Sequence, residues 1–214
     1  MFKFEKYILG ELATNCYLLW DENSKEAVVI DVADEGNFIA DEIAKRGLKL
    51  KYILSTHGHF DHNLGALDLK LVYSVPFCAS EKDFFLLEQQ QESANHFLEQ
   101  KVHVPNFKKI DINLDKKKEL FLGESKIKII QTPGHTPGGL SFLADNYLFD
   151  GDLIFADGMR GDSRHSYSSN RDIFRSICNI LELPENVEIL PGHGETTDIA
   201  SAKQFFNCQY CEWN

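Results

Sequence analysis

The chain of 214 residues has a formal net charge of −11 at pH 7 and a sequence pI of about 5.1. This acidity disfavours a nucleic-acid partner, because binding phosphates requires a basic face. The 16 phenylalanines provide ample material for a large apolar core, which excludes a disordered chain. No stretch reaches the roughly 18 apolar residues of a membrane span, and the first residues lack the apolar segment of a signal peptide.

The cysteines bear on the compartment. Five of them, at positions 16, 78, 178, 208 and 211, are spread widely along the chain. An odd, scattered set is not a disulfide framework and favours a reducing compartment. Cys208 and Cys211 form a single CxxC pair, which we expect to be ordinary helix residues because no second pair accompanies it. We therefore expect one domain, residues 1–214. We expect it in the cytoplasm, with no membrane partner. The sequence does not predict an oligomeric state.

Apolar and aromatic runs predict alternating strands and helices in the first half of the chain. Strands are expected at residues 2–9, 15–20 and 26–32, followed by an amphipathic helix at 37–46 that ends at Gly47. The run Tyr52-Ile53-Leu54 predicts a buried strand. After it we expect a helix at 62–71, a short strand at 76–79 and a long helix at 80–100 with Ser80 and Asp83 as start signals.

The second half begins with an irregular polar segment, residues 101–118, which is a candidate loop over an active site or else a surface connector. Two hairpins are then expected, residues 119–122 with 126–132 and residues 140–144 with 147–150. A helix at 170–183, a strand at 187–190 and a helix at 198–208 complete the chain. Strands and helices that alternate with short links indicate a layered α/β arrangement.

A histidine-rich stretch follows the predicted strand at 52–54. Ser55-Thr56-His57-Gly58-His59-Phe60-Asp61-His62 places three imidazoles and one carboxylate within six residues. Crowded imidazoles gain little unless something binds them, and a mixture with a carboxylate favours a borderline metal such as zinc. We favour a metal site here over surface or capping polar residues.

Three more strand ends carry donors of the same kind. His135 lies between prolines and glycines after one predicted strand, Asp152 follows Gly151 after another, and His193 follows Gly192 after a third. Strands of a layered fold present their ends at one edge, so these residues are expected to meet. Asp31, at the end of another strand, either supports this site or caps a loop.

With these motifs the chain resembles the metallo-β-lactamase superfamily, and within it the glyoxalase II-like hydrolases. The resemblance rests on His57-x-His59-x-Asp61-His62 followed in order by His135, Asp152 and His193. It implies a four-layer αββα sandwich, an α/β fold in which two mixed sheets pack face to face with helices outside. It also implies that His57, His59 and His135 hold one metal. Asp61, His62 and His193 would hold a second, and Asp152 would bridge the two.

The resemblance further implies a metal-dependent hydrolase of small molecules. A hydroxide that bridges two divalent ions would attack a thioester, such as a hydroxyacyl-glutathione, with Asp61 as a ligand that orients the nucleophile. Zinc is the expected metal, and iron or manganese would also suit the donors. The alternatives are an iron persulfide dioxygenase with one metal on His57, His135 and Asp152, a lactonase, a nuclease that the acidity disfavours, and a non-catalytic metal-binding scaffold.

The chain departs from the family pattern in three places. It ends soon after His193, without the additional helical domain that supplies much of the glutathione site in glyoxalase II. Arg160 lacks the glycine that usually stands directly before it, and it is expected either to contact substrate or to form a structural salt bridge. His165 lies in an unusual segment, and we expect it on a surface loop rather than at the mouth of the pocket.

Overall fold

Two six-stranded sheets form the centre of the protein, and the computed structural model describes residues 1–206 of it. The first sheet has the order β1-β2-β3-β4-β5-β6. Its strands are β1 (Phe2–Leu9), β2 (Thr14–Asp21), β3 (Glu26–Ile30), β4 (Lys49–Leu54), β5 (Phe77–Ala79) and β6 (Ile112–Asn113). The β1–β2 and β2–β3 pairs are antiparallel, and the pairs from β3 to β6 are parallel, so the sheet is mixed.

The second sheet has the order β12-β11-β10-β9-β8-β7. Its strands are β7 (Glu119–Leu122), β8 (Ser125–Gln131), β9 (Leu140–Ala144), β10 (Tyr147–Gly151), β11 (Glu188–Pro191) and β12 (Thr197–Asp198). Only the β10–β11 pair is parallel among its described pairs. Both predicted hairpins are present, and the second one turns at Asp145 with a positive φ of 51°.

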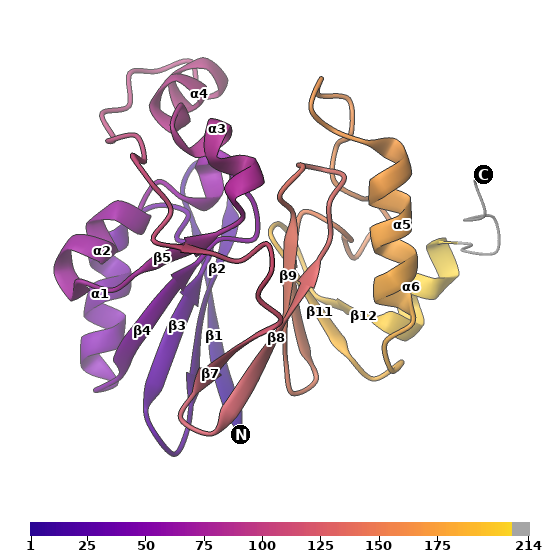
Figure 1. The fold of residues 1–214 in the computed structure, drawn as a ribbon, viewed down its shortest axis with the longest axis horizontal. Coiled ribbons are helices and arrows are strands. Elements are labelled where there is room, and N and C mark those ends of the chain that lie inside the picture. Colours follow the sequence, from indigo (N-terminus) through magenta and orange to yellow (C-terminus); the bar gives the residue numbers. More distant parts are fainter. Residues whose placement is uncertain (207–214) are drawn as a thin grey trace.

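Helices cover the outer faces of both sheets. Figure 1 shows α1 (Gly36–Lys45) and α2 (Ala66–Tyr73) beside the first sheet, and α5 (Asn170–Leu181) and α6 (Ile199–Phe205) beside the second. The short helices α3 (Phe84–Leu87) and α4 (Gln90–Phe97) lie beyond one end of the first sheet (Figure 1). The predicted four-layer sandwich of two mixed sheets is therefore confirmed.

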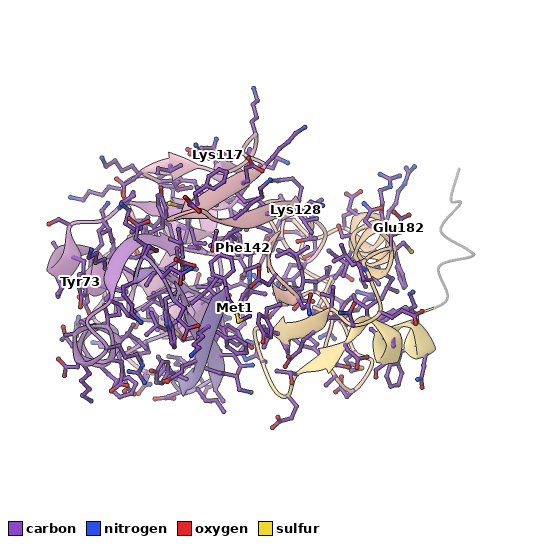
Figure 2. All side chains as sticks on the ribbon, turned by 90° about the horizontal axis from the view of Figure 1, so that it is seen from below. Met1, Tyr73, Lys117, Lys128, Phe142 and Glu182 are labelled. Atoms are coloured by element: carbon purple, nitrogen blue, oxygen red, sulfur yellow. The ribbon has the colours of Figure 1, made fainter. Side chains whose placement is uncertain are left out.

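Three apolar clusters correspond to the three interfaces between these layers. Leu18 and Val29 pack toward α1 and α2, whereas their neighbours in the strands point between the sheets and meet Phe142 and Phe149. Figure 2 shows Phe142 in the interior, while charged side chains such as Lys117 extend outward. The third cluster joins the second sheet to α5 and α6. Central strands buried on both faces explain the nearly continuous apolar runs in the sequence.

Two helix predictions were wrong. Instead of a helix at 62–71, the chain makes a 3₁₀ turn, η1 (Phe60–His62), and α2 begins only at Ala66. The side-chain amide of Asn63 donates to the carbonyls of His57 and His59, and Gly65 is drawn onto Val32 by a backbone bond of 3.0 Å. The N-terminus of α2 therefore does not start at the histidine-rich stretch.

The long helix expected at 80–100 is broken into η2 (Glu81–Asp83), α3 and α4. The break follows from contacts to remote parts of the chain. The backbone of Leu87 accepts a bond from Phe107 N, and the side chain of Gln90 donates to the carbonyl of Pro105. The last predicted helix begins as expected, but Cys208 and Cys211 lie outside the described residues. Within residues 1–206, none of the helices is long and apolar enough to cross a bilayer.

Candidate metal centre

The loops that carry the seven predicted donors meet at one edge, where strand ends of the two sheets face each other. Backbone bonds tie the sheets together at this edge: Leu140 N donates to Thr56 O over 2.8 Å, and Asn15 N donates to Gly192 O over 2.7 Å. The hydroxyl of Tyr17 in β2 also donates to the carbonyl of Pro191 in β11. The expectation that donors far apart in the sequence meet in space is confirmed.

Three histidines form a first group of donors. Nδ1 of His59 lies 3.0 Å from Nε2 of His57 and 3.0 Å from Nε2 of His135. His57 and His59 follow β4, whereas His135 comes from the loop between β8 and β9. Three ring nitrogens that converge so closely form a ready set of metal ligands.

A second group lies beside the first and shares one carboxylate with it. Oδ2 of Asp61 is 3.2 Å from Nε2 of His193 and 3.5 Å from Nε2 of His62. Asp152 lies between the groups, with Oδ1 3.5 Å from His62 Nε2 and Oδ2 3.7 Å from both His135 Nε2 and His193 Nε2. This carboxylate is thus in reach of both groups.

The outward ring nitrogens of these histidines are bound to the protein. Nδ1 of His62 lies 2.9 Å from a carboxylate oxygen of Asp31, and Nδ1 of His135 lies 2.7 Å from the carbonyl of Asp162. Nδ1 of His193 faces the carbonyl of Leu12 at 3.1 Å. These oxygens only accept, so each Nδ1 carries a proton and each Nε2 faces the centre, where it can serve as a metal ligand.

Asp31 orients His57 as well, through Thr56. The hydroxyl of Thr56 donates to Asp31 over 2.7 Å, so it accepts from Nδ1 of His57 at 3.1 Å. The sequence left two roles open for Asp31, supporting the site or capping a loop. The structure shows that Asp31 supports the site. His59 is turned the other way, with Nε2 2.9 Å from the hydroxyl of Tyr167.

The electrostatics differ between the groups. Burial, followed by the neighbouring histidines, lowers the pKa of His57 far below its usual value, and burial and His135 lower the pKa of His59 to about 3. Burial also acts to lower the pKa of His62, but the carboxylates of Asp61, Asp152 and Asp31 outweigh it and raise the pKa to about 10. His57 and His59 are therefore neutral donors, whereas the carboxylates around His62 favour a positive charge at that position.

Unpaired buried atoms show that the donors fit metal ions. His62 Nε2 and Asp152 Oδ1 are buried and have no hydrogen-bond partner among the described residues. Such atoms are rare unless a ligand satisfies them. Gly192 leaves room beside them, because an added Cβ would lie 2.4 Å from Asp152 Oδ1 and 2.5 Å from His62 Cε1. Imidazole and carboxylate donors in this number suit two divalent ions.

Asp83 is a structural residue of the site that sequence reasoning missed. Its carboxylate accepts from Gly58 N at 2.9 Å, from Thr136 Oγ1 at 2.6 Å and from Gly138 N at 2.6 Å. It therefore fastens the loop of His57 to the loop of His135. An acidic residue at a helix start is common, so the sequence carried no signal of this role beyond capping.

A cleft of about 170 Å³ opens beside the donors. His165 and Tyr167 line it with stacked rings, 5.1 Å apart and 7° from parallel, so the expectation that His165 lies away from the mouth was wrong. Ser93 and Phe97 of α4 line it too. The segment 101–118, expected as a loop over the site, contributes instead to a neighbouring cavity through its first two residues.

Arg160 is engaged within its own segment. Its guanidinium donates to Ser163 Oγ at 2.8 Å and to Asn170 Oδ1 at 2.7 Å, and it lies 4.9 Å from the ring centre of Phe174. The structure records neither a salt bridge for Arg160 nor a place for it in the cleft wall, as far as the described residues go. Contact with substrate stays a prediction that this geometry does not support.

Comparisons with known proteins agree with this geometry. Residues 9–193 match the family model of the Metallo-beta-lactamase superfamily. The chain is 34% identical over 202 residues to hydroxyacylglutathione hydrolase GloC of Haemophilus influenzae, covering 89% of this chain and 90% of the relative. It is 30% identical over 181 residues to a probable polyketide biosynthesis zinc-dependent hydrolase, BaeB of Bacillus velezensis, covering 83% of this chain and 72% of the relative.

A solved structure, BLEG-1 B3 metallo-beta-lactamase, is similar with a TM-score of 0.86 and 27% identity, and the match covers 98% of this chain and 100% of that one. The family model alone spans most of the chain, from β1 to the last of the predicted donors. The relatives and the solved structure agree with it over nearly the same length. The chain belongs to the metallo-beta-lactamase superfamily.

Proposed function

We propose that the protein is a metal-dependent hydrolase that cleaves a thioester at a centre of two divalent ions. The observation that carries this proposal is the pair of complete donor groups that share Asp152. An iron dioxygenase with one metal on His57, His135 and Asp152 would not require the second group. Here the ligand atoms of Asp61, His62 and His193 also lie within 4.8 Å of one another, which favours two ions.

In this proposal His57, His59 and His135 would hold one ion, and Asp61, His62 and His193 would hold the other. Asp152 would lie within reach of both. Bound ions of this kind lower the pKa of a water molecule to about 7 and polarise a carbonyl oxygen. Zinc is the expected metal because imidazole and carboxylate donors suit it. The relative BaeB, which is described as zinc-dependent, supports this choice.

The side chains around the centre orient the carboxylate of Asp61 and provide an apolar wall. Thr14 Oγ1 donates to Oδ2 of Asp61 over 3.2 Å and fixes one face of that carboxylate. Phe60 and Phe97 stack with ring centroids 5.9 Å apart and give the cleft an apolar wall. A thioester suits such a site because a thiolate leaves readily, so no protonating side chain is required. The likeness to hydroxyacylglutathione hydrolase GloC supports a thioester rather than a lactone.

Elemental analysis combined with a hydrolysis assay tests the proposal. The purified protein should contain about two divalent ions per chain and should hydrolyse at least some members of a panel of thioesters. Asp61→Ala should lower the metal content toward about one and reduce kcat/KM by at least 100-fold. Asp68→Ala is the matched control, because Asp68 is an exposed carboxylate of α2, remote from the donors.

Three outcomes would reject the proposal. A content of one iron per chain that Asp61→Ala leaves unchanged, with oxygen uptake on a glutathione persulfide, would identify the dioxygenase instead. A fully metal-loaded protein that hydrolyses lactones but no thioester would identify the lactonase. A metal-loaded protein that hydrolyses none of the substrates would indicate the non-catalytic metal-binding scaffold.

A further inference from the structure

The cleft beside the metal centre has an apolar wall that lacks permanent cations. Apart from the donors and Gly58, its aliphatic and aromatic side chains are Leu12, Phe60, Leu86, Phe97 and Tyr167. Ser93 and His165 are the remaining polar residues. No lysine or arginine lines this cleft within the described part of the chain. A substrate arm placed here meets apolar surface and finds no counter-ion for a carboxylate.

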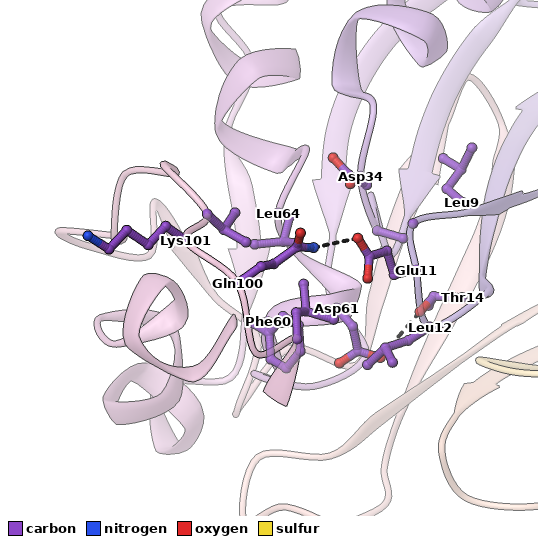
Figure 3. A pocket seen from close by; sticks show the side chains of 14 residues that line it. Leu9, Glu11, Leu12, Thr14, Asp34, Phe60, Asp61, Leu64, Gln100 and Lys101 are labelled. Atoms are coloured by element: carbon purple, nitrogen blue, oxygen red, sulfur yellow. Dashed lines mark hydrogen bonds between the residues drawn. The ribbon is translucent and has the colours of Figure 1, made fainter. Parts of the chain in front are cut away.

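A second cavity of about 230 Å³ lies on the other side of Asp61 and shares Leu12 and Phe60 with the cleft. Its wall is acidic. Figure 3 shows Glu11 and Asp34 beside it, with the amide of Gln100 donating to Glu11. Among the described residues, Lys101 is the one cation of this wall, and its side chain extends away from Asp61 (Figure 3). Carboxylates therefore outnumber ammonium groups here.

The two cavities both border the metal centre through Asp61, and Leu12 and Phe60 line both of them. A thioester bound with its carbonyl at the centre would extend one arm to each side. Glutathione carries two carboxylates on its thiol arm. In either cavity those carboxylates would lose water, and in the second they would also face Glu11 and Asp34.

We propose that the site takes a thioester whose thiol arm is uncharged and carries amide or hydroxyl donors. This inference rests on the proposed thioester hydrolysis and narrows it. The carboxylates of Glu11 and Asp34 accept from such donors, and the apolar cleft takes the acyl arm. The bound ions would polarise the carbonyl, which all thioesters share.

A matched pair of substrates tests the proposal on the metal-loaded full chain. Both carry the same short hydroxyacyl group, one on glutathione and the other on N-acetylcysteamine, which is uncharged and contains an amide. We expect kcat/KM to be at least tenfold higher for the N-acetylcysteamine thioester. The ratio should narrow in high salt, because salt screens the repulsion of glutathione carboxylates.

Charge variants assign this preference to the second cavity. Glu11→Gln combined with Asp34→Asn should raise kcat/KM severalfold for the glutathione thioester and lower it for the uncharged thioester, whose donors lose their charged acceptors. The control is Asp68→Asn combined with Glu182→Gln, which removes one exposed carboxylate from α2 and one directly after α5 and should change neither value. Equal or better hydrolysis of the glutathione thioester by the unmodified protein would overturn the proposal.

Binding of uncleavable thioethers separates this inference from the proposed function. S-alkyl N-acetylcysteamine should bind the metal-loaded protein more tightly than S-alkyl glutathione in calorimetry, and the double variant should reduce the difference. Tighter binding of the glutathione thioether would overturn the inference even if thioesters are hydrolysed. Absence of all thioester hydrolysis, with this binding preference intact, would reject the thioesterase function alone.

Discussion

The carboxylate of Asp31 lies 2.9 Å from Nδ1 of His62 at the seam between the two sheets. It also accepts from the backbone N–H and the hydroxyl of Thr56, at 2.8 and 2.7 Å. One carboxylate therefore orients His62 directly and His57 through Thr56. Asp31 adopts a left-handed backbone conformation with φ 55°, which asparagine also tolerates.

Replacing this carboxylate should weaken metal binding. Asp31→Asn keeps the shape and backbone preference but removes the charge that holds the Nδ1 proton of His62. We expect metal affinity to fall by about 10- to 100-fold, as for other residues that orient metal ligands. Competition with a chromophoric chelator measures this. Asp34→Asn, on the same loop and without an imidazole contact, should retain the original affinity; equal affinities in both variants would contradict the role of Asp31.

The hydroxyl of Tyr167 is expected to tune the first donor group through His59. Tyr167→Phe removes the oxygen 2.9 Å from His59 Nε2 and keeps the ring stacked on His165. The absorption bands of the cobalt-substituted protein should shift, and metal affinity should fall by about tenfold. Tyr73→Phe is the control, because that hydroxyl bonds only the carbonyl of Ala40 among its described partners. Identical cobalt spectra for the Tyr167→Phe variant and the unmodified protein would contradict this prediction.

Two neighbouring glycines should respond differently to alanine. In Gly192→Ala the new Cβ would press on Asp152 Oδ1 and His62 Cε1, so we expect loss of bound metal from a folded chain. In Gly194→Ala the new Cβ meets nothing within 4 Å, but the φ of 74° is unfavourable for alanine. That variant should lose about 1 kcal/mol of stability and keep its metal. Elemental analysis and urea unfolding distinguish the two outcomes, and a fully loaded Gly192→Ala protein would refute the close packing.

The acid sensitivity of the fold should depend on Asp21, at the end of β2. Burial tends to raise the pKa of this carboxyl, but hydrogen bonds from Ser24 and Ser125 prevail and lower it to about 2. The ordinary pKa is about 3.9, so the folded state favours the ionised form. Its stabilising contribution is complete above that value and is lost as the pH falls through the folded pKa.

We therefore expect the stability difference between the unmodified protein and Asp21→Asn to shrink by about 1 kcal/mol between pH 6 and pH 3. Urea unfolding of the metal-free proteins measures it, so that metal release does not contribute. Asp68→Asn provides the comparison for an exposed carboxylate. A difference that stays constant with pH would show that Asp21 does not titrate as proposed.

Local sequence signals were sufficient for much of the fold and the donor set. Apolar runs located the main strands, and glycines and prolines located the loops after them. Because histidine spacing is itself local, the stretch from His57 to His62 was visible without any knowledge of the fold. Strand ends in a layered fold meet at one edge, and this rule predicted that His135, Asp152 and His193 lie near that stretch.

The sequence did not reveal features that depend on contacts between residues far apart in the chain. Asp83 appeared to start a long helix, but its carboxylate is occupied by Gly58 and Thr136, which approach from two other loops. The delayed start of α2 depends on the contact of Gly65 with Val32 across the first sheet. His165 reaches the cleft because it stacks on Tyr167, and no periodicity in the sequence reports a ring contact of that kind.

Each sheet is built from one uninterrupted half of the chain, the first from residues 2–113 and the second from residues 119–198. The first half supplies the donors from His57 to His62, and neither donor group is complete without the second half. During synthesis the donors from His57 to His62 leave the ribosome before His135, Asp152 and His193 have been synthesised. The first donor group can therefore form only after His135 has emerged and the second only after His193 has emerged, so metal binding at the complete site would be a late step that follows pairing of the two halves.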